Sequence, residues 1–202
     1  MKTGPRYKIC KRLGNGVFEK CQNQKFSLSE ERSKKSEKRS KGNMSDFAKQ
    51  MLEKQRVRML YGITERQFRK YVDESLAHGK EAKTELLSKL ESRLDNTLYR
   101  VGLTKTRRAA RQMAAHGHVM VNKKRVTVPS YNLSKGDVVE VRDGSKSKAH
   151  IVEAKEKIAD VTAPRWIKFE NTSLVATVLE QPNAENTDMP FDLAQVLEFY
   201  SR

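Results

Sequence analysis

The sequence predicts an α+β fold: a mostly helical module, a small helix-helix-β-hairpin domain, and a basic, extended amino-terminal arm. Apolar residues recur at helical spacing over residues 45–101, and short apolar runs alternate with polar residues between residues 118 and 141. Residues 1–41 instead contain 13 Lys and Arg against 4 Asp and Glu, with few apolar residues. We therefore expect three parts: an arm at 1–43, a helical module at 44–91 joined in space by the carboxyl-terminal part 157–202, and a compact domain at 92–156.

The arm contains a charged, serine-rich stretch, SLSEERSKKSEKRSKG, at residues 27–42. It has too few apolar side chains to offset the loss of chain entropy on folding, so we expect it to be disordered on its own. We interpret it as a basic arm that orders only against nucleic acid; a simple tail is the alternative.

The helical module begins at Ser45, which is expected to cap a helix that runs to Gly62. Thr64 is expected to cap a second helix that stops at Gly79. Apolar residues recur at every fourth position over residues 68–76 of this helix, which predicts one buried face.

A third helix is expected from about residue 84 to Val101, closed by Gly102. Its predicted buried positions are Leu87, Leu90, Leu94, Leu98 and Val101. Two acidic residues of this helix, Glu91 and Asp95, lie near Arg93 and Arg100 in the sequence, so ion pairing explains them better than acid–base catalysis.

The compact domain continues with a short basic helix. Thr104 or Thr106 caps it, and Gly117 ends it after about His116. Its cations repel one another by tenths of a kcal/mol per pair. They are Lys105, Arg107, Arg108 and Arg111. The repulsion is relieved beside a polyanion, which favours a binding role over the alternative of a solvated helix face.

Residues 118–122 and 125–128 alternate weakly and bracket Lys123 and Lys124, so they predict a β-hairpin with a basic tip. A third strand is expected at residues 138–141, followed by a polar connector that leads into a helix. The remaining expected elements are strands at residues 164–169 and 173–178 and a docked helix within FDLAQVLEFYSR, residues 191–202.

The formal charge of +16 and the pI near 9.9 exceed what solubility requires and indicate a polyanionic partner. Together with the basic helix and hairpin tip, they favour RNA over a small-molecule substrate. The sequence lacks phosphate-loop, nucleophile-elbow and zinc-protease motifs, so we expect no enzyme and no cofactor. It also lacks an apolar run of about 18 residues and a secretory signal, so we expect a cytoplasmic protein without membrane contact.

Cys10 and Cys21 are too few to form a tetrahedral zinc site by themselves, and no histidine stands near them. We expect two ordinary thiols and no bound metal. The pair His116 and His118 straddles a helix end and suits packing or RNA contact better than metal binding.

Several long blocks occur in a fixed order: LEKQRVRMLYGITERQFRKYV, LLSKLESRLDNTLYRVG, TRRAARQMAAHGHVMVN, VPSYNLSKGDVVEVR, PRWIKFE and VLEFYSR. Through these blocks the chain resembles bacterial ribosomal protein four of the small subunit, from about Met44 onward. The unit at residues 93–141 alone is less specific, because it also resembles parts of pseudouridine synthases, some tyrosyl-tRNA synthetases and a heat-shock protein.

The resemblance implies a primary binder of small-subunit (16S) ribosomal RNA. Such a protein nucleates assembly of the subunit body at a multi-helix junction and contributes to translational accuracy. The implied neighbours are ribosomal proteins five and three and the messenger RNA near its entry channel. The implied RNA-binding residues of the helical module are Lys54, Arg56, Arg58, Arg66, Arg69 and Lys70. Those of the compact domain are Arg93, Arg100, Lys105, Arg107, Arg108, Arg111, His118, Lys123, Lys124, Arg125 and Tyr131.

The chain departs from the family pattern in two places. Many members carry four amino-terminal cysteines that bind zinc, or a Gly-Gln-His-Gly stretch, where this chain has only two cysteines and SEKRSKGN. Relatives often have Asn-Gly at the hairpin tip, where this chain has Asn122-Lys123. Lysine adopts positive φ less readily than glycine, so the sequence leaves a longer or different turn open.

Three other functions compete with this interpretation. We do not expect a pseudouridine synthase, because the roughly sixty residues after residue 142 are too few for a catalytic domain. A stand-alone RNA chaperone or regulator would need only the compact domain and leaves the helical module unexplained. A purely structural interaction protein would not carry nucleic acid through purification.

Overall fold

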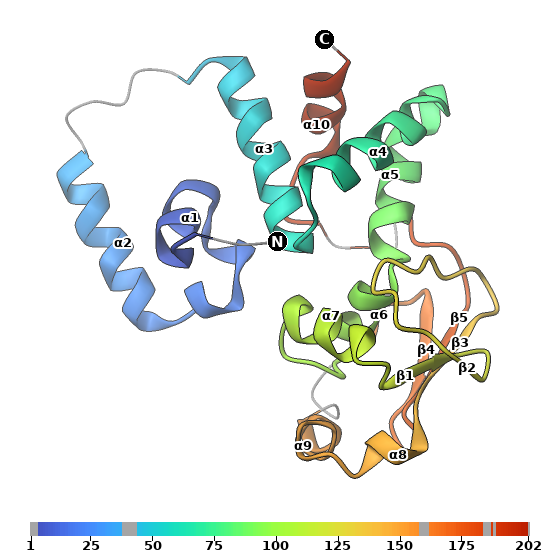
Figure 1. Ribbon diagram of the computed structural model, residues 1–202. Coiled ribbons are helices and arrows are strands. Elements are labelled where there is room, and N and C mark those ends of the chain that lie inside the picture. The colour runs from blue at the N-terminus through green and yellow to red at the C-terminus, as the bar shows by residue number, and fades with distance from the viewer. Residues whose placement is uncertain (1–3, 38–43, 158–161, 184–186, 188, 202) are drawn as a thin grey trace. The chain divides into compact units, whose positions relative to one another are not determined.

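The computed structural model describes residues 4–37, 44–157, 162–183, 187 and 189–201. The chain divides into two compact units. The helical unit consists of Met1–Lys83 with Met189–Arg202, and the sheet unit consists of Thr84–Asp188. Every strand in the described part of the chain belongs to the sheet unit (Figure 1). The α+β prediction is therefore confirmed.

The helical unit contains α3 (Asp46–Tyr61) and α4 (Glu65–Leu76) with the predicted caps. The Ser45 hydroxyl accepts a hydrogen bond from the Ala48 amide, and the Thr64 hydroxyl does the same for the Gln67 amide. Gly62 adopts a left-handed conformation that closes α3. α4 ends at Leu76, and a short 3₁₀ turn, η3 (Gly79–Glu81), follows it.

The predicted carboxyl-terminal helix is α10 (Leu193–Tyr200), and it packs on α3 and α4 as expected. Leu193 and Val196 are fully buried. The Phe199 ring lies 5.5 Å from the Phe47 ring of α3, and the Tyr200 ring lies 6.0 Å from the Phe68 ring of α4. These aromatic contacts join the end of the chain to helices more than a hundred residues earlier.

The prediction of an extended amino-terminal arm is wrong for the residues described. They form α1 (Arg6–Leu13), the 3₁₀ turns η1 (Asn15–Val17) and η2 (Glu19–Cys21), and α2 (Gln24–Glu37). α2 covers part of the stretch expected to be disordered, and residues 38–43 lie outside the described residues.

A small core explains this order. Cys10, Cys21 and Phe26 are almost completely buried together, and the Arg56 guanidinium of α3 donates to the Leu13 carbonyl at 2.7 Å. The two cysteines form a disulfide, so the expectation of two ordinary thiols is also wrong. The turns between α1 and η2 bring the two side chains together, a proximity that the sequence spacing did not reveal.

The expected third helix is broken in two. α5 (Ala82–Glu91) and α6 (Leu94–Arg100) are separated at Ser92 and Arg93, where the Arg93 backbone is extended. Arg93 forms an antiparallel bridge with Asn132, and the Leu133 amide donates to the Ser92 carbonyl at 2.8 Å. Strand-like hydrogen bonds to a distant loop therefore override the continuous helical pattern.

The sheet is antiparallel, with the strand order β2-β1-β3-β5-β4. The strands are β1 (Val119–Val121), β2 (Lys124–Arg125), β3 (Val138–Val141), β4 (Ile167–Glu170) and β5 (Val175–Val178). The other helices of this unit are α7 (Arg107–Ala115), α8 (Asp143–Lys146) and α9 (Ala149–Lys157).

The sheet corrects the expected domain boundaries. β5 pairs with β3, so much of the part 157–202 completes the sheet, and only Met189–Arg202 belongs to the helical unit. The first boundary falls after Lys83 rather than after residue 91. α5 belongs mainly to the sheet unit, where the hydroxyls of Ser88 and Ser92 donate to the Gln181 side-chain carbonyl.

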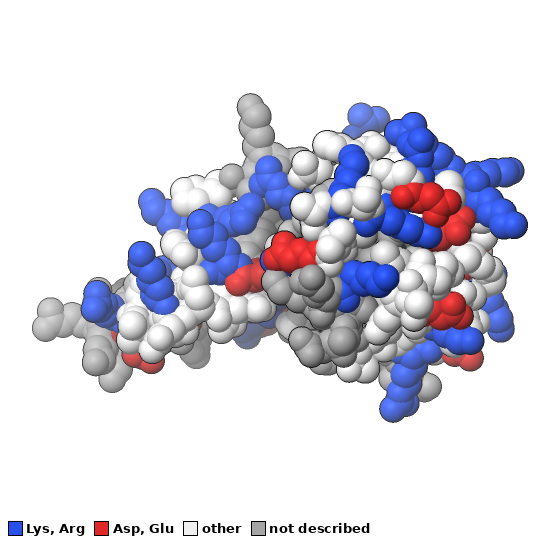
Figure 2. All heavy atoms as spheres, turned by 90° about the horizontal axis from the view of Figure 1, so that it is seen from below, with Lys and Arg blue, Asp and Glu red and all other residues white. Residues whose placement is uncertain are grey.

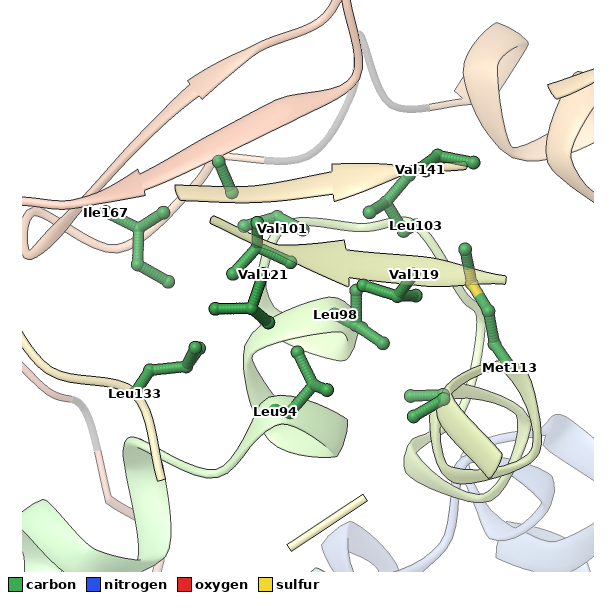
Figure 3. Close-up of a cluster of buried hydrophobic side chains, with 14 of the residues drawn as sticks. Leu94, Leu98, Val101, Leu103, Met113, Val119, Val121, Leu133, Val141 and Ile167 are labelled. Atoms are coloured by element: carbon green, nitrogen blue, oxygen red, sulfur yellow. The ribbon is translucent and has the colours of Figure 1, made fainter. Parts of the chain in front are cut away.

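The core of the sheet unit lies between α6, α7 and the sheet (Figure 3). Leu94 and Leu98 of α6 point toward Val119 and Val121 of β1. Trp166, just before β4, belongs to the same core and is fully buried. The predicted buried positions of the third helix, from Leu87 to Val101, are all confirmed.

Candidate nucleic-acid interface

The basic helix of the compact domain is α7, and the structure selects Thr106 as its cap. The Thr106 hydroxyl accepts a hydrogen bond from the Ala109 amide at 3.1 Å. The helix buries Ala110, Met113 and Ala114 against the core. The two alanines let the helix pack close to the core. Because the buried face is apolar, the long cationic side chains lie on the other faces of the helix. Arg108 is exposed and Arg111 is half-buried.

The hairpin tip is a two-residue turn rather than a longer one. Asn122 and Lys123 both have positive φ, 50° and 65°, and Val121 pairs with Lys124 directly across the turn. The Asn122 side chain fixes the turn, because it donates to the Asp137 carboxylate at 2.8 Å and accepts from the Val138 amide at 3.0 Å.

The tip is cationic and solvent-exposed. Lys123, Lys124 and Arg125 are all exposed. The Arg125 guanidinium donates to the His116 carbonyl at 3.2 Å and lies directly over Gly117, where a Cβ atom would collide with it. Glycine is thus required at residue 117 for two reasons: its backbone is left-handed, and the Arg125 side chain lies close to its Cα atom. The contacts of Arg125 connect the hairpin to the end of α7.

Arg93, which the resemblance implied as an RNA-binding residue, is buried in this structure. Its side chain is 1% exposed and forms a bidentate ion pair with Asp95, with Nε–Oδ1 and Nη2–Oδ2 distances of 2.9 and 2.6 Å. A side chain this enclosed cannot reach a phosphate. It fixes the bend between α5 and α6 instead.

The other predicted RNA-binding residues of the sheet unit differ in the exposure of their side chains and in their internal contacts. Arg100 and Arg107 are partly buried and belong to a hydrogen-bonded chain that starts at Glu91. Lys105 is exposed and pairs with Glu153, whereas His118 is half-buried, with Nδ1 3.0 Å from the Ser145 hydroxyl. The Tyr131 side chain is exposed.

In the helical unit the six predicted residues separate into two groups. The exposed group, on α4, consists of Arg66, Arg69 and Lys70. The partly buried group, on α3, makes internal contacts. Lys54 and Arg58 bind the Glu65 carboxylate at 2.8 and 2.6 Å, and Arg56 binds Glu53 at 2.6 Å. Lys54 and Arg58 therefore join α3 to α4, whereas the three cations of α4 face solvent.

Glu65 is the centre of the α3–α4–α10 contact, because the Tyr200 hydroxyl also donates to it at 2.7 Å. Burial raises the pKa of Glu65, but hydrogen bonds from Lys54 and Tyr200 and the charges of Lys54 and Arg58 together hold it below its usual range. Burial, followed by the contact with Glu65, raises the pKa of Tyr200.

This contact predicts a pH dependence. Since the folded pKa of Glu65 is lowered, its contribution to stability is present above its ordinary pKa of about 4.3 and is lost as the pH falls through the lowered value. We expect near-ultraviolet circular dichroism to report loosening of α10 below about pH 4. Glu65→Gln should weaken this acid transition, and Asp73→Asn, at an exposed acid of α4, should leave it unchanged. An unaltered transition in Glu65→Gln would contradict the assignment.

Two exposed cations that the sequence interpretation missed lie near the hairpin. Lys135 stands in the turn whose Asp137 carboxylate holds Asn122, and Arg142 follows β3, with its amide donating to the His118 carbonyl. Both residues lie close to the ends of the predicted strand 138–141, and that position was the signal in the sequence that could have identified them. Figure 2 shows Lys and Arg side chains spread over much of one face, with smaller groups of Asp and Glu between them.

The described residues include no group of three or more His, Cys, Asp or Glu side chains that could hold a metal ion. In the same part of the chain, no helix is both long and apolar enough to cross a membrane.

Two family models match this chain. The family described as ribosomal protein S4/S9 N-terminal domain matches residues 1–92, and the S4 domain matches residues 92–139. Small ribosomal subunit protein uS4 of Pseudothermotoga lettingae is 38% identical over 99% of this chain and 98% of its own length. The uS4 protein of Thermotoga maritima is also 38% identical, with the same shares covered. That of Corynebacterium kroppenstedtii is 42% identical over 78% of this chain and 79% of its own. The chain therefore belongs to the uS4 family of small-subunit ribosomal proteins.

Proposed function

We propose that this protein is a structural, non-enzymatic constituent of the small ribosomal subunit that binds 16S ribosomal RNA in the bacterial cytoplasm. The observation that carries the proposal is the presence of exposed cations on both folded units. On the helical unit they are Arg66, Arg69 and Lys70, and on the sheet unit they are Arg108, Lys123, Lys124 and Arg125. Family membership over nearly the whole chain supports the same conclusion.

The proposed mechanism divides affinity from specificity. Lys and Arg neutralise phosphates and release counterions, which gives affinity for any RNA. Side chains cannot read the deep, narrow major groove of A-form RNA, so specificity comes from the shape of a folded junction. Two cationic units on one chain bind two RNA helices, and both can bind at once only when the angle between the RNA helices is right. Such a protein nucleates assembly of the subunit body.

We further propose that ribosomal proteins five and three and messenger RNA near its entry channel are neighbours in the assembled subunit, and that the protein contributes to translational accuracy. The acidic carboxyl-terminal region supports a protein-facing surface, because residues 160–202 contain 3 Lys and Arg against 7 Asp and Glu. Carboxylates repel RNA phosphates and attract basic protein surfaces. Cross-linking in the assembled subunit tests these neighbours directly.

The test of the central proposal is a salt series of binding to the 5′ domain of 16S RNA, beside a plain duplex of equal length. We expect a steep slope of log K against log salt, consistent with about six or more neutralised phosphates, and a preference for the junction that persists at higher salt. Equal affinity for both RNAs would overturn shape-specific assembly and favour a general RNA chaperone.

Lys123→Gly should separate stability from RNA affinity. Glycine adopts the positive φ of this turn position without the steric cost of a Cβ atom, so the free energy of unfolding should rise by about 0.5–1 kcal/mol. Removal of one phosphate-binding charge should lower the salt slope by about 0.7–0.9. Urea unfolding and RNA titration measure the two effects, with Lys123→Gln as the variant that loses charge alone. If Lys123→Gly lowered stability, the proposed turn strain would be wrong.

A further inference from the structure

Glu91 is a carboxylate buried at the carboxyl end of α5, and two side chains of α6 satisfy it. Its side chain is 0% exposed. Arg100 donates to it through Nε at 2.9 Å and Nη2 at 2.7 Å, and the Asn96 amide donates at 2.8 Å. Stability alone does not explain this arrangement, because well-packed apolar side chains often replace a buried ion pair at no cost.

The Asn96 side chain continues the chain of hydrogen bonds to α7. Its Oδ1 accepts from the Arg107 Nε at 2.9 Å, while its amide nitrogen is occupied by Glu91. The Arg107 guanidinium also lies 4.3 Å from the centre of the Tyr99 ring. A hydrogen bond and an aromatic ring thus both help to orient the first residue of the basic helix.

Arg100 and Arg107 therefore belong to one polar chain, yet neither is fully enclosed. The Arg100 side chain is 23% exposed, and Arg107 is half-buried. A planar guanidinium that is already oriented loses less conformational entropy when it binds a phosphate. The neighbouring Arg108 is exposed, and within the described part of the chain it has no hydrogen bond or ion pair to fix it.

We propose that Glu91 and Asn96 are positioning residues for RNA binding, which hold Arg107 and Arg100 ready to meet RNA phosphates at the α6–α7 junction. Glu91 orients Arg100 directly, and Asn96 transmits the constraint to Arg107. The inference rests on the proposed function. It adds that two side chains without phosphate contact determine how tightly the RNA is held.

The test is a double-mutant cycle on RNA affinity in the full-length protein. Asn96→Ala should weaken binding of the 5′ domain of 16S RNA by about tenfold, within the range of coupling between contacting residues. In an Arg107→Gln background the same change should have almost no effect. In the matched Arg108→Gln background the full tenfold loss should remain. Equal losses in all three backgrounds would overturn the proposal, since a general structural defect acts equally on each.

A second pair of variants keeps the test decisive if Asn96→Ala fails to fold. Glu91→Gln preserves the side-chain shape, and its effect on affinity should shrink in an Arg100→Gln background and disappear when Arg100 and Arg107 are both replaced by glutamine; an undiminished effect in the doubly replaced background would contradict the proposal. Arg107→Lys retains the charge but not the oriented fork, so it should keep the salt slope and lose about tenfold in affinity. Unchanged affinity in Arg107→Lys would show that residue 107 acts on RNA only through its charge, and would contradict the proposal. If the unaltered protein bound no 16S RNA, the proposed function itself would fail.

Discussion

Asp95→Ala should destabilise the sheet unit by about 3–5 kcal/mol, the cost of leaving one member of a buried ion pair without its partner. The Arg93 guanidinium is almost completely enclosed and forms two parallel hydrogen bonds with Asp95. The Asp95 and Leu94 amides also hold the neighbouring loop, because they donate hydrogen bonds to the Pro129 and Tyr131 carbonyls. Loss of the carboxylate should therefore loosen the bend between α5 and α6.

Urea unfolding followed by tryptophan fluorescence measures this effect, because Trp166 is the single tryptophan and is buried in the core of the same unit. Glu153→Ala is the matched control. It removes the acid from the exposed pair with Lys105 and should cost about 1 kcal/mol or less. Similar losses in the two variants would show that burial of the Arg93–Asp95 pair has no special importance.

Combined replacement of Arg66, Arg69 and Lys70 by glutamine should weaken RNA binding roughly 100-fold at about 0.15 M salt. The salt slope should fall by about 2–3, because each replacement removes one phosphate contact. Stability should change little, since the side chains of Arg69 and Lys70 are 70% and 73% exposed and their partners Asp73 and Glu74 lie 3.7 Å away.

The acidic partners supply the control for this prediction. Asp73→Asn together with Glu74→Gln keeps all three cations and removes two charges that repel phosphate, so RNA affinity should rise. Titrations at several salt concentrations measure both variants. If removal of the three cations left the salt slope unchanged, α4 would not face RNA, and the proposal of two gripping units would fail.

The first prediction concerns a buried cation and the second concerns exposed cations. Together they show that basic residues in the sequence do not by themselves define an RNA-binding site. Arg93 and the α4 cations carry the same charge, and the family resemblance implied the same role for them. The structure makes Arg93 part of the fold and leaves Arg66, Arg69 and Lys70 exposed. Mutation of Arg93 would therefore weaken binding through unfolding, and such a result would say nothing about RNA contact.

The sequence by itself determined the local elements. Ser45 and Thr64 cap helices because their hydroxyls satisfy amides three residues later, and Gly62 and Gly117 end helices because glycine tolerates positive φ. The alternating runs around residues 119–121, 138–141 and 175–178 formed strands. These features depend on neighbours within a few residues, so the local pattern contains the information.

Only the tertiary structure decided what depends on distant partners. The break before α6 requires the loop at Asn132 and Leu133, and the confinement of Lys54 and Arg58 requires the contact of α4 and α10 around Glu65. The disulfide between Cys10 and Cys21 requires the turns that join α1 to η2. The residue type alone gives the charge of a side chain, but its exposure depends on packing against residues far along the chain. That is why the fold class could be predicted, whereas the division of cations between scaffold and interface could not.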